Sequence, residues 1–377
     1  MDILLSFSNG IGQIAFAVIG FILIMSLVVF VHEYGHFSVA RLCGVTVTDF
    51  SIGFGKKILS RKDKHGTLWS LSLIPMGGYV KFLGDKSAGS HEDLQKLNNL
   101  SDSEKKQSFY FKSIPQKIAI ILAGPLANIL LCVFLLFFIN FFLGIQTNQP
   151  IIKNVNADSA AYRNGLQDGD RFVTINGHNI QTAQEVKKEV SASFGDPIEL
   201  TISRDNEQVA LLLTPDMVAV AGETEKIPVM GVIFSDAPEH IIISNYNFTE
   251  ALKKSYQDTV FLARLTGIFF QRVFTGKAGA DTLSGPIRIS DAAGTALQSG
   301  VWSFLLLMAL ISMSIGLVNL LPVPMLDGGH LVFYLLEAVG LKANPRVREI
   351  AFKMGFVLVV SLMVFTVIND IITIGAR

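Results

Sequence analysis

The stretch His32–His36 (HEYGH) directly follows an apolar run, Ile11–Val31, that contains no charged residue. As a helix, this run is long enough to cross a hydrocarbon core roughly 30 Å thick. If the helix continues through the motif, the two histidines at i and i+4 share one face and Glu33 lies beside them. Two imidazoles on one face form half of a zinc site, and a neighbouring carboxylate can take a proton from metal-bound water. The stretch therefore predicts a hydrolytic metal site within or beside a lipid bilayer.

The composition favours a multi-pass α-helical membrane protein. Hydrophobic residues make up 50% of the chain, charged residues only 16%, and the mean hydropathy is +0.47, unlike a typical soluble domain. We predict about four transmembrane helices, within residues 1–36, 116–143, 301–330 and 351–370. The first is interpreted as a span rather than a signal peptide, because no basic residue precedes it and it runs into the metal motif.

The charges of the loops predict an orientation. Residues 37–115 carry 12 Lys and Arg against 7 Asp and Glu, whereas residues 144–300 carry 13 against 18. Basic residues near the ends of spans favour the cytoplasmic side, so loop 37–115 is expected in the cytoplasm. Both termini and the second loop are then extracytoplasmic.

The cytoplasmic loop contains a candidate β-hairpin at residues 67–83, which read TLWSLSLIPMGGYVKFL. Serine alternates with leucine, a Pro-Met-Gly-Gly turn follows, and a β-rich run closes the segment. Because the segment is so apolar, we expect a membrane-associated hairpin, although a small cytoplasmic hairpin fits the same pattern. A substrate strand added to its edge would contact four candidate substrate-binding residues: Leu73, Gly77, Gly78 and Tyr79.

The second loop contains a compact domain at residues 146–234. A short helix after Asp158 ends at a glycine, a Gly-Asp turn and a strand follow, and the strand closes at Asn176-Gly177. A helix over Val186–Phe194 and a hairpin around Asp205-Asn206 complete the pattern. This pattern resembles the PDZ domain of bacterial membrane and periplasmic proteases, an α+β domain whose presence implies substrate selection by strand addition or a size filter. A structural spacer is the alternative.

Residues 246–300 follow as an amphipathic connecting helix and a loop. From Phe248 to Gln271, apolar residues recur at mostly helical spacing with charged residues between them. This pattern predicts a helix on the outer membrane surface, and packing against the PDZ-like domain explains it equally well.

A second motif lies at the end of the third span, where residues 319–330 read NLLPVPMLDGGH. Two prolines break an uncharged helix and place the carboxylate of Asp327 at membrane depth, where an ionisable group needs a partner. A zinc ion held by the two histidines is suitable, and Asp327 as third ligand leaves a fourth position open, as catalytic zinc requires. Asn319 is the candidate for stabilising a tetrahedral oxyanion. His330 is a competing third ligand.

The two motifs, the PDZ-like insert and the segment Ala123–Asn128 (AGPLAN) together resemble the site-2 protease family of regulated intramembrane zinc proteases. The resemblance covers nearly the whole chain, although the best-known bacterial members carry two PDZ copies and this chain shows one. It implies a Zn²⁺ cofactor. The residues that it implies are His32, His36 and Asp327 as zinc ligands, Glu33 as the catalytic carboxylate and Asn319 as a polar active-site residue.

The family resemblance also implies the partners. The substrates are expected to be single-pass membrane-anchored proteins in the lipid bilayer, such as anti-sigma factors or signal-peptide remnants, trimmed first by an upstream site-1-type protease. No nucleic-acid partner is expected. Two other functions stay open. A transporter also has broken helices and polar residues in its spans, but the chain shows no inverted repeat. A catalytically silent membrane scaffold with a PDZ domain fits less well, because every side chain that the chemistry needs is present.

Overall fold

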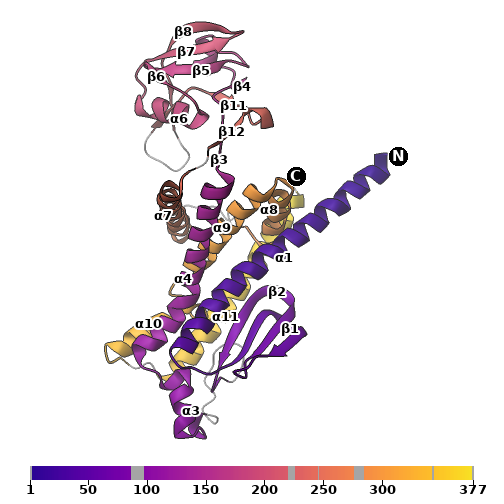
Figure 1. Cartoon of the computed structure of the whole chain (residues 1–377), viewed down its shortest axis with the longest axis vertical. Coiled ribbons are helices and arrows are strands. Elements are labelled where there is room, and N and C mark those ends of the chain that lie inside the picture. Colours follow the sequence, from indigo (N-terminus) through magenta and orange to yellow (C-terminus); the bar gives the residue numbers. More distant parts are fainter. Residues whose placement is uncertain are drawn as a thin grey trace. The chain divides into compact units, whose positions relative to one another are not determined.

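The structure is a computed structural model that describes residues 2–85, 97–219, 226–244, 246–275, 284–341 and 344–375. The chain divides into two compact units. The membrane unit comprises Met1–Ile139 and Leu252–Arg377, and the insert unit comprises Asn140–Ala251. Figure 1 labels the elements of both.

The first span is one long helix, α1 (Asp2–Leu42), which continues through the metal motif (Figure 1). Its segment Gly12–Leu42 is apolar and long enough to cross a membrane. In hydrocarbon, a helix is the single-segment structure that satisfies its own backbone N–H and C=O groups. The apolar run and the motif therefore form one element, as predicted.

The second span is α4 (Ile114–Phe138), which a π-helical turn, η2 (Ile139–Leu143), extends. Pro115 occupies its first turn, where a missing N–H costs nothing. Pro125 lies inside the helix, which continues past it. Helix α4 packs against both α1 and α9 (Val301–Asn319), so it connects these two helices of the membrane unit.

The predicted span 301–330 is two helices, α9 (Val301–Asn319) and α10 (Asp327–Ala338). Pro322 and Pro324 lack the backbone donor that a continuing helix needs, and the chain is broken between the two helices as expected. The fourth span is α11 (Pro345–Gly375). Helix α9 and the segment Arg346–Ile372 complete four helices that are long and apolar enough to cross a membrane within the described ranges. The chain is therefore a helical membrane protein.

The core of the helix bundle is formed by α1, α4, α8 (Pro286–Gln298) and α9. Its fully or almost fully buried members are Ile24, Val28, Cys132, Leu135, Leu136, Ala293, Met308, Ala309 and Met313. By contrast, α11 exposes apolar side chains such as Met354 and Val357, which are 68% and 63% accessible. Such exposure is expected of a helix that faces lipid rather than water.

The stretch 67–83 is not a hairpin on its own, which corrects the sequence-based prediction. The strands are β1 (Val47–Lys62) and β2 (Leu68–Phe82), and they pair with each other. Residues 49–52 of β1 pair with residues 78–81 of β2 and also with residues 68–71. They therefore lie between the two halves that were predicted to pair. The prediction failed because β1 carries glycines and four basic residues, a composition that favours a loop.

The turn that joins the two strands is held by Asp63. Its Oδ1 accepts hydrogen bonds from the backbone N–H groups of His65 and Thr67, each at 2.9 Å. Its Oδ2 accepts from Arg41 at 2.7 Å and from Trp69 Nε1 at 3.2 Å. Partial burial raises the pKa of Asp63, but these hydrogen bonds outweigh it and hold the pKa below its ordinary value. Because Arg41 belongs to the last turn of α1, this carboxylate ties the sheet to the helix that carries the metal motif.

Four short or peripheral helices complete the membrane unit: α3 (Asp102–Gln107), η1 (Phe109–Phe111), α7 (Phe248–Phe274, which begins in the insert unit) and α8 (Pro286–Gln298). Helix α7 lies where the amphipathic helix was predicted. Its apolar side chains are exposed, with Tyr256 and Phe261 at 67% and 59%, whereas Ser255 and Thr259 are buried. This exposed apolar face agrees with a position on the membrane surface, which stays a prediction.

The insert unit is an α+β fold around a four-stranded sheet in the order β6-β5-β7-β8 (Figure 1). Its helices are α5 (Ala160–Arg163), α6 (Ala183–Ala192) and η3 (Pro238–His240). Its strands are β3 (Ile145–Asn148), β4 (Ile152–Val155), β5 (Arg171–Ile175), β6 (His178–Asn179), β7 (Ile198–Arg204), β8 (Glu207–Leu213), β9 (Asp216–Ala219), β10 (Lys226–Val229), β11 (Val232–Phe234) and β12 (Ile241–Ser244). The predicted hairpin is β7–β8, and Asp205 and Asn206 at its turn both have positive φ, as a tight hairpin requires.

A groove of 450 Å³ lies between α6 and β11 of the insert unit. Helix α6 lines it with Ala183, Gln184 and Lys187, and strand β11 lines it with all three of its residues. Strand β11 pairs with β4, and no other described strand pairs with it. The groove therefore contains a strand edge that can accept a further strand.

Candidate metal centre

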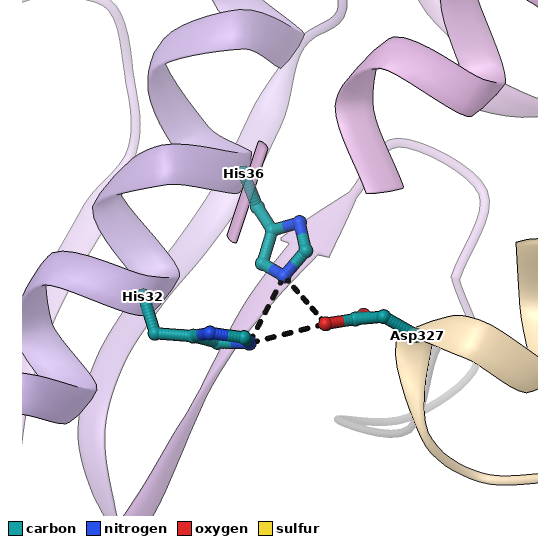
Figure 2. Close-up of side chains that lie close together, drawn as sticks. All are labelled: His32, His36 and Asp327. Carbon is teal, nitrogen blue, oxygen red and sulfur yellow. Dashed lines mark hydrogen bonds and ion pairs between the residues drawn. The ribbon is translucent and has the colours of Figure 1, made fainter. Parts of the chain in front are cut away.

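Three potential ligand atoms meet at one point of the membrane unit. His32 and His36 project from successive turns of α1, and Asp327 is the first residue of α10 (Figure 2). The two Nε2 atoms are 3.3 Å apart, and Oδ2 of Asp327 lies 3.1 Å from Nε2 of His32 and 3.3 Å from Nε2 of His36. Because the third predicted span is broken, the carboxylate of Asp327 lies against the face of α1 that carries the two histidines.

These separations fit a metal ion. Ligand atoms about 2.0–2.1 Å from a tetrahedral zinc ion stand about 3.3 Å from one another. The three distances between the ligand atoms agree with that edge length. The Oδ2 atom of Asp327 is buried, and among the described residues it is paired only with the Nε2 atoms of the two histidines. A buried carboxylate oxygen needs a compensating charge. Two neutral imidazoles and one carboxylate therefore suit a divalent cation with an open fourth position.

A backbone carbonyl sets the orientation of His36. Its Nδ1 lies 2.8 Å from the carbonyl oxygen of Ile120 in α4. A carbonyl can only accept, so Nδ1 carries the proton and the lone pair of Nε2 points toward the centre. A Cβ on Gly124, also in α4, would lie 2.6 Å from Cε1 of the same ring. Glycine at this position lets α4 approach close enough for the hydrogen bond to form.

Glu33 lies next to the ligands but is not one of the clustered residues. Strand β2 passes close to it, because a Cβ on Gly78 would lie 2.9 Å from Cγ of Glu33. Gly78 is thus the predicted substrate-binding residue that the structure brings to the site. Of the other three, Tyr79 stacks on Phe54 with ring centroids 6.3 Å apart, Gly77 packs against the same phenylalanine, and Leu73 is 63% exposed.

The two remaining candidates from the second motif have different surroundings. Asn319 is the last residue of α9, and its Nδ2 lies 3.5 Å from Nε2 of His32. Its amide therefore adjoins the predicted metal position. The ring of His330 packs on Phe352 of α11, with centroids 4.5 Å apart. His330 is not among the clustered ligands of the described residues, so the geometry favours Asp327 as the third ligand.

Sequence reasoning gave no role to three positions of α4 that contact the histidines: the carbonyl of Ile120, Gly124 and the side chain of Asn128. Nδ2 of Asn128 lies 3.3 Å from Nδ1 of His32. One signal was available, because Asn128 is one of the few polar residues in this apolar span and a polar group at membrane depth needs a partner. The carbonyl of Ile120 and the close helix approach at Gly124 could not be predicted from a single sequence in this way.

The chain is similar to known proteases over almost its whole length. The model of peptidase family M50 matches residues 20–362. Two relatives named as candidate zinc metalloproteases are 37% and 38% identical. The first, from Agrobacterium fabrum, aligns over 94% of this chain and 95% of its own length, and the second, from Mesorhizobium japonicum, over 93% and 97%. The regulator of sigma-E protease RseP of Salmonella typhimurium is 29% identical over 93% of this chain and 97% of its own.

Among solved structures, the PDZ domain of the SdrC-like protein from Listeria monocytogenes is 17% identical. It aligns with 24% of this chain and 90% of its own, with a TM-score of 0.21.

We predict that Gly124→Ala weakens zinc binding by tenfold or more, because the new methyl group displaces the ring of His36. Gly267→Ala in α7 is the matched control, since a Cβ there meets nothing within 4 Å and both changes raise helix propensity by about 1 kcal/mol. Zinc retained after dialysis against a chelator is the measurement. Equal retention by both variants would contradict the contact that we describe.

Proposed function

Because the chain belongs to peptidase family M50 and is a zinc metalloprotease, we propose that it hydrolyses peptide bonds within or near the transmembrane segments of single-pass membrane proteins. One observation carries this proposal. The two histidines of the candidate metal centre lie on α1, within the segment Gly12–Leu42 that is long and apolar enough to span a membrane. A hydrolytic site on a membrane-spanning helix suits a substrate that is itself in the membrane.

In the proposed mechanism, His32, His36 and Asp327 hold the zinc ion. When bound, zinc supplies a Lewis acid and lowers the pKa of water to near neutrality. Glu33 takes the proton of the attacking water and passes it to the nitrogen of the leaving amine. The amide of Asn319, which adjoins His32, donates a hydrogen bond to the oxygen that gains negative charge.

The substrate has to be extended at the point of cleavage, because a helix keeps its carbonyl groups in internal hydrogen bonds. We place the extended segment along residues 78–81 of β2. Residues 78–82 pair with β1 on one side and with no other described strand. Asp85 already bonds the backbone of Phe82, so the edge to which a strand can be added consists of residues 78–81. Because Gly78 has no Cβ, this edge can lie close to the side chain of Glu33. That proximity would align the scissile bond with the catalytic carboxylate.

We predict that Glu33→Gln abolishes cleavage of a membrane-anchored model substrate and leaves zinc content unchanged. The amide keeps the size of the side chain but cannot carry the proton, and loss of a general base costs about 10²–10⁴-fold in rate. Cleavage in detergent or vesicles, together with zinc analysis of both proteins, is the measurement. Equal cleavage by both proteins would sink the mechanism and reopen the transporter and scaffold functions.

We predict that binding of an uncut substrate to the Glu33→Gln variant slows amide hydrogen exchange in residues 78–81. New hydrogen bonds from an added strand would protect this edge. Residues 57–62 pair with residues 68–72 and form the other edge of the sheet, so they are the internal control. Unchanged exchange at residues 78–81 in a complex shown to be formed would refute strand addition there.

We further propose that the chain lies in a bacterial inner membrane with the insert unit and both termini outside the cytoplasm. The excess of basic residues in loop 37–115 supports this orientation. The PDZ-like pattern of the insert unit and the groove beside β11 support a role in selecting substrates. Substrates would be membrane proteins, anti-sigma factors or signal-peptide remnants among them, whose outer part an upstream site-1-type protease has already trimmed.

We predict that Ile233→Arg raises the KM for a trimmed substrate and leaves kcat nearly unchanged. Ile233 is 50% exposed in the groove, and the longer charged side chain would obstruct it. Leu212→Arg is the control, because Leu212 is 63% exposed on β8 outside the groove. An unchanged KM would argue for a spacer or a size filter.

The orientation has its own test, which is digestion by protease added to spheroplasts, whose outer membrane has been opened. Protection of the insert unit under these conditions would contradict the orientation.

A further inference from the structure

Asn128 occupies the junction of three helices beside the candidate metal centre. Its side chain is fully buried in α4, and Nδ2 faces Nδ1 of His32 in α1. Its backbone carbonyl accepts a hydrogen bond of 2.8 Å from Oγ of Ser312 in α9. The amide oxygen Oδ1 is buried and has no hydrogen-bond partner among the described residues. A fully buried amide with one end against a ligand and the other end unsatisfied needs an explanation.

The two histidines differ in what holds their second nitrogen. Nδ1 of His36 faces a backbone carbonyl, which can only accept and therefore fixes one tautomer. Nδ1 of His32 faces a side-chain amide, which can donate through nitrogen or accept through oxygen. The tautomer of His32 thus depends on which end of the Asn128 amide is turned toward it.

With Nδ2 toward the ring, Nδ1 accepts and the proton of His32 resides on Nε2. That proton then points toward Oδ2 of Asp327, 3.1 Å away. Coordination of a metal through Nε2 requires the opposite tautomer, in which Nδ1 carries the proton and donates. A half-turn of the amide about its terminal bond places Oδ1 where Nδ2 stands, so the oxygen accepts a hydrogen bond from Nδ1 of His32. The amide nitrogen then takes the buried position that has no partner among the described residues.

We propose that Asn128 is a positioning residue that holds His32 in its metal-binding tautomer by turning its amide oxygen toward Nδ1. The inference rests on the proposed assignment of His32 as a ligand through Nε2. Hydrogen bonds from such outer partners fix the ring and raise the basicity of the ligand, and their loss typically weakens metal binding about 10–100-fold. Asn128 acts through His32 and touches neither substrate nor the reacting atoms.

The test measures the affinity of the full-length protein in detergent for Zn²⁺ alone, by competition with a chromophoric chelator. Asn128→Ala removes the acceptor and is expected to weaken binding about 10–100-fold. Asn128→Asp keeps an acceptor of the same shape and removes the donor, so its affinity should stay within about threefold of the parent or rise, as carboxylate–histidine–zinc triads suggest. Ser312→Ala is the matched control, because it removes the contact between α9 and Asn128 but leaves the amide in place.

Three results would overturn the proposal: an Asn128→Ala affinity within about threefold of the parent, an Asn128→Asp affinity as low as that of the alanine variant, or an equal loss in Ser312→Ala. The last would show general loosening of the helix junction. If the alanine variant does not fold, the isosteric aspartate variant decides alone. His32→Ala tests the assignment of His32 as a ligand separately from the role of Asn128. Undiminished zinc binding by that variant would refute the ligand assignment.

Discussion

The structure depends on the meeting of two imidazole nitrogens and one carboxylate oxygen within 3.1–3.3 Å of one another. Such a cluster is unfavourable in a bilayer unless a cation holds it together, because buried ionisable groups need compensation. A divalent metal supplies that compensation, and the distances between the ligand atoms are those that tetrahedral zinc requires. The break between α9 and α10, where Pro322 and Pro324 lie, and the passage of α1 through its motif bring these three atoms together.

The packing of α4 against α1 orients the two histidine ligands. Gly124 brings α4 against the ring of His36, and the carbonyl of Ile120 then fixes its tautomer. Asn128 stands one turn further along α4, where its amide reaches His32. One helix that contributes no ligand therefore orients both histidine ligands. Supporting partners of this kind determine how well a metal site is pre-organised.

The sequence predicted the parts of the site that depend on short-range periodicity and on the cost of burial. Helical spacing placed His32 and His36 on one face, and an ionisable group at membrane depth marked Asp327. The pairing of strands that are distant in the chain could not be predicted from the sequence. Strand β1, rich in lysine and glycine, was not recognised, so the partner of β2 was predicted wrongly. The role of Asn128 depends on how α4 crosses α1, which no local pattern encodes.

The most direct test of the account is zinc K-edge X-ray absorption on the purified full-length protein, with metal content measured in the parent and in Asp327→Ala. The account predicts one zinc per chain, bound by two imidazoles and further oxygen ligands at about 2.0–2.1 Å. It also predicts a large loss of zinc in the variant. A sulfur ligand in the first shell, or full zinc retention without Asp327, would contradict it.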